Sequence, residues 1–162
     1  MRTDLPRVMV IGVGNEYRGD DGVGRRVARE LRGRAPRTTA ILEATGEGTA
    51  LLESWKGAES VVIIDAVASG ASPGTIHRLD ARAQALPAGL LHTSTHAFGV
   101  AQAVELARAL GQLPRSLVIY GIEGKTFDPD TGLSPEVEHA AGEVVERILR
   151  EIKEGTSCMN RP

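Results

Sequence analysis

Residues 7–34 read RVMVIGVGNEYRGDDGVGRRVARELRGR, an apolar run, a glycine-rich loop and a helix-forming segment in succession. The first part, RVMVIGV, is typical of a buried strand. The apolar residues after DDG recur at helical spacing. A strand that passes at once into a helix is typical of α/β proteins, so this stretch predicts that fold class.

The alternation of strand and helix continues along the chain. Strands are also predicted at 38–44, 59–67, 74–80 and 116–122, and helices at 20–34, 48–57, 95–112 and 134–154. Residues 68–92 contain more loop-forming residues, so the strand within them is expected at the edge of the sheet. We therefore predict a three-layer α/β sandwich, in which helices flank both faces of a twisted, mostly parallel sheet of about five strands.

The length of 162 residues suits one compact domain with a single core. No linker, repeat or low-complexity block divides the chain, so we expect one domain at 1–153 and a mobile C-terminal tail at 154–162. The single cysteine, Cys158, lies in this tail. A lone cysteine excludes an intrachain disulfide, and its position in a tail argues against a catalytic nucleophile.

Charge and hydropathy argue against two classes of partner. The formal net charge is −2 and the isoelectric point is near 6.1, so the chain lacks the basic surface that binds nucleic acids and anionic membranes. No apolar run approaches the roughly 20 residues that span a bilayer, and no signal-peptide cleavage site is recognisable. We therefore expect a cytoplasmic protein that binds neither nucleic acid nor membrane.

The glycine-rich loop resembles a phosphate-binding loop in its position but not in its chemistry. A dinucleotide pattern that starts at Gly12 needs a third glycine where the chain has Tyr17, and a P-loop that starts at Gly14 needs lysine and serine or threonine where it has Asp20 and Asp21. Two carboxylates would repel phosphate, which argues against a nucleotide-binding module. A simpler alternative is that one of the aspartates caps the following helix.

Polar side chains are predicted at the carboxyl ends of several strands, which is where α/β proteins bind ligands. Asp20 and Asp21 follow the first strand, Asp65 closes the run VVIID, and His96 opens the third predicted helix. Carboxylates combined with an imidazole suit Ni, Zn, Mn or Co and leave coordination positions open for a substrate or water. The alternatives are a solvent-facing Asp65 and a structural His96.

Other candidate residues and motifs are weaker. His77 and His139 are expected at the surface, whereas His92 lies nearer the predicted site. The chain has neither the GxSxG motif of serine hydrolases nor the HExxH motif of zinc proteases.

Four motifs stand out by their order and spacing along the chain: GVGNEYRGDDGVG (12–24), VVIIDAV (61–67), STHAFGV (94–100) and IYGIEGKTFDPDTGLSPEV (119–137). In this order they resemble the motifs of the nickel–iron hydrogenase maturation endopeptidases. The resemblance implies an endopeptidase that removes the C-terminal extension of the hydrogenase large-subunit precursor after nickel insertion. It places the metal-contacting and catalytic positions on Asp21, Asp65 and His96, with Asp20 and Asn15 supporting the loop.

The resemblance also implies that nickel arrives with the precursor and that the enzyme is a monomer. It leaves two roles open for the metal, which either activates water and the scissile carbonyl or only positions the chain while another carboxylate acts as general base. Two further functions stay open, another metal-assisted peptidase of this architecture and a non-enzymatic nickel carrier or assembly factor.

Overall fold

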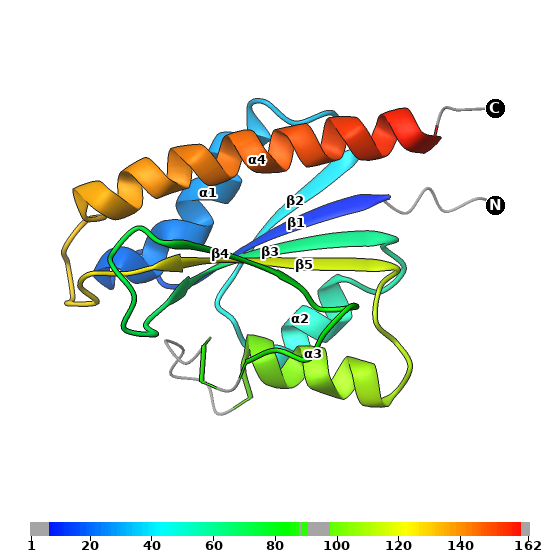
Figure 1. The fold of residues 1–162 in the computed structure, drawn as a ribbon, viewed down its shortest axis with the longest axis horizontal. Coiled ribbons are helices and arrows are strands. Elements are labelled where there is room, and N and C mark those ends of the chain that lie inside the picture. Colours follow the sequence, from blue (N-terminus) through cyan, green and yellow to red (C-terminus); the bar gives the residue numbers. More distant parts are fainter. Residues whose placement is uncertain (1–6, 88, 91–97, 160–162) are drawn as a thin grey trace.

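A computed structural model describes residues 7–87, 89–90 and 98–159 and shows an α/β sandwich (Figure 1). The strands are β1 (Val8–Val13), β2 (Thr39–Ala44), β3 (Ser60–Val67), β4 (Ile76–Asp80) and β5 (Ser116–Glu123). The helices are a 3-10 turn, η1 (Gly19–Gly22), followed by α1 (Val23–Arg32), α2 (Gly48–Ser54), α3 (Val100–Ala109) and α4 (Pro135–Met159). The predicted fold class is confirmed.

The sheet has the strand order β2-β1-β3-β5-β4. β1, β2, β3 and β5 run parallel, and β4 pairs antiparallel with β5 at one edge, where the loop-rich segment predicted an edge strand. Because the central strands are parallel, their carboxyl ends lie along one side of the sheet, at the left in Figure 1. In the register of this sheet, Asp65 of β3 lies opposite Gly121 of β5.

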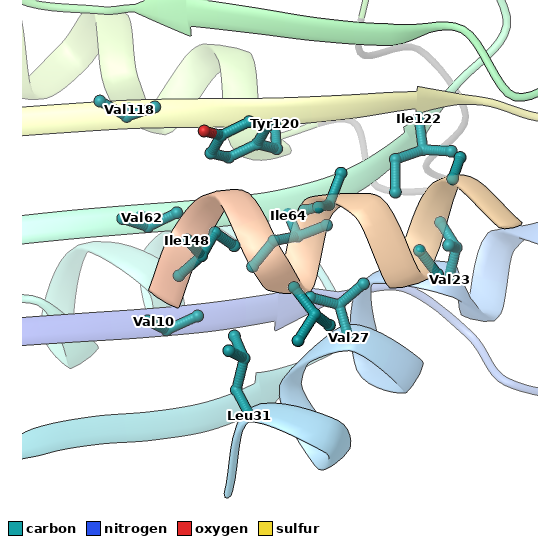
Figure 2. Close-up of a cluster of buried hydrophobic side chains, with 14 of the residues drawn as sticks. Val10, Val23, Val27, Leu31, Val62, Ile64, Val118, Tyr120, Ile122 and Ile148 are labelled. Carbon is teal, nitrogen blue, oxygen red and sulfur yellow. The ribbon is translucent and has the colours of Figure 1, made fainter. Parts of the chain in front are cut away.

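Helices cover both faces of the sheet and bury two separate apolar clusters. Val10, Val62 and Ile64 point toward α1 and α4, and Figure 2 shows them in one cluster with Val27 of α1 and Ile148 of α4. Alternate residues of the same strands, Ile11 and Ile63 among them, pack with α2 and α3 on the other face. Burial on both faces explains why these strands read as nearly continuous apolar runs.

Glycines allow α1 to lie very close to the sheet. A Cβ atom added at Gly24 would lie 2.4 Å from the carbonyl oxygens of Ile64 and Val13, and one at Gly12 would lie 2.2 Å from the carbonyl oxygen of Gly24. Both distances are far shorter than a van der Waals contact. The glycines of the first loop therefore serve helix–sheet packing, which brings η1 and its aspartates to the end of β3.

We expect Gly24→Ala to lower the free energy of unfolding by about 1–3 kcal/mol, because the added methyl group forces α1 away from the sheet. Gly142→Ala is the matched control, since Gly142 also lies within a helix but a Cβ added there would meet no other part of the fold within 4 Å. It should stabilise the protein by roughly 0.5–1 kcal/mol through helix propensity. Denaturant unfolding of both variants measures the difference, and equal effects would contradict the packing argument.

The helix boundaries differ from the prediction in detail. The first predicted helix begins as the 3-10 turn η1, and α4 continues to Met159, past the residue at which we placed the end of the domain. The division of the chain at residue 153 stays a prediction. None of the helices in the described part of the chain has the length and apolarity needed to cross a membrane.

Candidate functional site

The carboxyl ends of β1, β3 and β5 bring together several buried acidic residues. Asp20 and Asp21 lie on η1, directly after the loop that leaves β1, while Asp65 lies in β3 and Glu123 ends β5. All four are buried. Buried carboxylates are costly unless each has a partner, so their partners distinguish structural residues from candidate ligands.

Within the described part of the chain, Asp65 has few of the donors that usually stabilise a buried carboxylate. The residue is only 2% exposed, and the hydrogen bond that its carboxylate accepts is local, from the amide of Ala66 to Oδ1 at 2.8 Å. Burial, and then the negative charge of Asp21, raise the pKa of Asp65 well above its usual range. Such a carboxyl group must hold a proton or face a cation.

Asp21 lies close enough to Asp65 for the two charges to repel. Its Oδ2 accepts a hydrogen bond from the amide of Asn15 at 3.0 Å, which folds the preceding loop around the carboxylate. Gly14 makes this possible, because its φ of 141° suits glycine and a Cβ there would lie 1.9 Å from the carbonyl oxygen of Asp21. The alternative of simple helix capping is wrong for α1, whose N-cap is Gly22 without a side-chain cap hydrogen bond.

Asp20 has a different environment from its neighbour. Its carboxylate accepts hydrogen bonds from the amides of Lys125 at 2.7 Å, Thr126 at 3.1 Å and Ser134 at 2.7 Å. The hydroxyl of Ser134 also donates to it. Asp20 therefore joins η1 to the loop between β5 and α4. This structural role fits the support that we expected from it and leaves Asp21 as the candidate ligand.

Glu123 forms a second buried cluster that sequence reasoning missed. Its carboxylate accepts hydrogen bonds from the amides of Ser69 and Gly70 and from the hydroxyl of Ser69, and it lies 3.2 Å from Nε2 of His77. Burial disfavours its ionised form, but these bonds outweigh burial and lower the pKa of Glu123. A charged residue at the end of the apolar run LVIYGI was the available signal.

The predictions for the four histidines differ in how they compare with the structure. His77 is partly buried against Glu123 rather than at the open surface, because β4 turns its side chain toward the end of β5. His139 is exposed on α4, as expected. His92 and His96 lie outside the described residues, so the place of His96 stays a prediction. Within the described ranges, no group of three His, Cys, Asp or Glu side chains could hold a metal ion.

A surface hollow of about 660 Å³ lies at the other end of the sheet, around the end of α2 and the segments that lead into β3 and β5. Its lining includes Trp55, Lys56, Glu59 and Arg115 but no histidine and no buried carboxylate. Parallel sheets bind ligands at their carboxyl ends, so the acidic cluster is the better candidate for the active site.

A family model described as HycI: Hydrogenase maturation protease matches residues 25–151. The chain is also 30% identical, over 152 residues, to the Hydrogenase 2 maturation protease of Escherichia coli strain K12, in a match that covers 91% of this chain and 92% of the relative. This chain belongs to the hydrogenase maturation protease family. It is therefore a hydrolase, an endopeptidase of hydrogenase maturation, rather than a nickel carrier or a nucleotide-binding module.

Solved structures of hydrogenase maturation proteases have the same fold. The hydrogenase maturating endopeptidase HybD from E. coli is 28% identical with a TM-score of 0.77, and the match covers 92% of this chain and 93% of that chain. The [NiFe] hydrogenase maturation protease HybD from Thermococcus kodakarensis is 28% identical with a TM-score of 0.72, covering 90% of this chain and 99% of that one. The similarity of fold thus extends over nearly the whole chain.

Proposed function

We propose that this endopeptidase removes the C-terminal extension from the precursor of a nickel–iron hydrogenase large subunit after nickel has been inserted. In this proposal Asp21, Asp65 and His96 complete the coordination of the nickel ion that the precursor carries. Nickel is therefore part of the substrate. The observation that carries the proposal is the pair of buried carboxylates, Asp65 and Asp21, at the ligand-binding edge of a maturation protease.

A divalent cation would resolve the electrostatic conflict between these two residues. Asp65 is buried beside the charge of Asp21 and has a raised pKa. The two carboxylates repel each other, and a cation bound between them would be attracted to both. Carboxylate oxygens together with an imidazole suit nickel. Three ligands from the protease would leave coordination positions for ligands that the precursor supplies.

The position of α3 supports His96 as the third ligand. Alternation along β3 places Asp65 on the same face as Ile63, which packs with α2 and α3. The described chain resumes at Phe98, whose carbonyl oxygen accepts a hydrogen bond from Gly48 at 2.8 Å. Gly48 begins α2 directly after the loop that leaves β2. Phe98, two residues after His96, therefore lies on the side of the sheet where the parallel strands have their carboxyl ends. We call this side the carboxyl edge.

Recognition of nickel would make cleavage conditional on metal insertion. A nickel-free precursor lacks the cation that stabilises Asp21 and Asp65, so it should bind weakly and stay uncut. The test is intact-mass analysis of a large-subunit precursor, nickel-loaded and nickel-free, before and after incubation with the protease. We expect loss of one defined C-terminal peptide only from the nickel-loaded form. Equal cleavage of both forms would contradict nickel recognition, and cleavage of neither would contradict the proposed substrate.

Substitution of the predicted ligands tests the site itself. Asp21→Ala and His96→Ala should each reduce the processing rate at least about 100-fold, because a missing ligand leaves the nickel incompletely held. His139→Ala is the matched control, since it removes an exposed histidine from α4, and it should process normally. Wild-type rates for both ligand variants would contradict the site assignment.

A further inference from the structure

Tyr17 is a large side chain exposed beside the candidate site. It is 69% exposed, more than the two other exposed large hydrophobic residues in the described part of the chain, Leu110 and Leu106. Tyr17 lies in the loop between β1 and η1, four residues before Asp21. Four residues of chain span at most about 14 Å, so the backbone of Tyr17 lies within that distance of the candidate ligand.

The backbone of Tyr17 is held in place although its side chain is exposed. Its amide donates to Oδ1 of Asn15 at 2.9 Å, and its carbonyl oxygen accepts from the amide of Asp130 at 2.8 Å. The amide of Asn15 in turn donates to the carboxylate of Asp21. The ring therefore projects from a loop fixed to the candidate ligand on one side and to the loop before α4 on the other.

Arg18, the next residue in the chain, adds a positive charge to this loop. Among the described residues its guanidinium makes no hydrogen bond or ion pair, and the residue is only partly buried. By contrast, arginines of the neighbouring helix α1 are engaged, as in the pairs of Arg29 with Glu16 and of Arg32 with Glu43. Tyrosine and arginine are among the residue types enriched at the hot spots of protein–protein interfaces.

We infer that Tyr17 and Arg18 form a docking surface for the precursor protein, separate from the residues that contact nickel. This inference rests on the proposed function. Tyr17 packs against an apolar side chain of the precursor, and Arg18 pairs with a carboxylate beside it. Because the loop is already ordered by Asn15 and Asp130, little conformational entropy is lost when the precursor binds.

The test is steady-state processing of nickel-loaded precursor by four variants. Tyr17→Ala should raise KM at least about tenfold and change kcat less than about twofold, because the ring contributes to binding rather than to bond cleavage. Tyr17→Phe should retain the wild-type KM, since it keeps the ring. Arg18→Gln should raise KM roughly three- to tenfold and make KM less sensitive to salt.

Leu110→Ala is the matched control. Leu110 is 58% exposed, but it follows α3 and is distant in the fold from the carboxyl edge, so its variant should keep the wild-type KM. A wild-type KM for Tyr17→Ala, or an equal increase for Leu110→Ala, would overturn the docking surface and leave the proposed function intact. A wild-type enzyme that does not cleave the nickel-loaded precursor would overturn both.

Discussion

Asp65→Asn is expected to abolish processing while making the metal-free protein more stable. The substitution removes a negative charge that burial and the charge of Asp21 both disfavour. It keeps the shape of the side chain and an oxygen that can accept the hydrogen bond from Ala66. Loss of an anionic ligand should reduce the processing rate of nickel-loaded precursor by about 1,000-fold or more, as removal of central groups in active sites does.

The gain in stability should depend on pH in a direction set by the raised pKa. Well below the ordinary aspartate pKa of about 3.9, Asp65 is protonated in both the folded and the unfolded chain, so wild type and variant should be equally stable. As the pH rises, the unfolded chain releases the proton more readily than the folded protein. Wild-type stability therefore falls relative to the variant until the pH exceeds the raised pKa of Asp65.

Thermal unfolding in the presence of a chelator, from about pH 3 to about pH 8, measures this difference. We expect the advantage of Asp65→Asn to grow from near zero to about 1–2 kcal/mol, which corresponds to roughly 2–8 °C for a domain of this size. Asp80→Asn, at an exposed position that ends β4, is the control and should show no such growth. A constant difference across the pH range would contradict the electrostatic origin.

Much of the fold could be predicted because local and global signals agree. The strands of the sheet read as apolar runs since helices cover both of their faces, and the helices between them carry helical spacing. The edge strand β4 was foreseen because loop-forming residues surround it. The prediction failed in details that depend on tertiary contacts, such as the 3-10 turn η1, which forms where the first loop folds against Thr126.

The site could be predicted only in part. The positions of Asp21 and Asp65 after apolar strands identified them as candidates. Sequence alone could not show that the carboxylate of Asp20 accepts hydrogen bonds from backbone amides more than 100 residues away. The same limitation explains why Glu123 and Tyr17 were not recognised as notable. A buried carboxylate and an exposed ring are defined by their neighbours, and those neighbours come from other segments of the chain.

Asp20→Asn is expected to destabilise the protein, in contrast to the same substitution at Asp65. Both aspartates are buried, but Asp20 accepts hydrogen bonds from three amides and one hydroxyl, of Lys125, Thr126 and Ser134. An asparagine has one acceptor oxygen and a nitrogen that can only donate, so its nitrogen must face other N–H groups. Unsatisfied buried donors of this kind cost about 1–3 kcal/mol each.

We therefore expect Asp20→Asn to lower the free energy of unfolding by about 3–5 kcal/mol, or the melting temperature by on the order of 10 °C. Thermal unfolding measures the loss, and hydrogen exchange should locate it, with faster exchange of the amides of Lys125, Thr126 and Ser134 than in Asp65→Asn. An unchanged melting temperature would show that these donors find other partners and would contradict the structural role of Asp20. Opposite signs for one chemical change at two buried aspartates would separate the carboxylate that supports the loop from the carboxylate that is free to meet a cation.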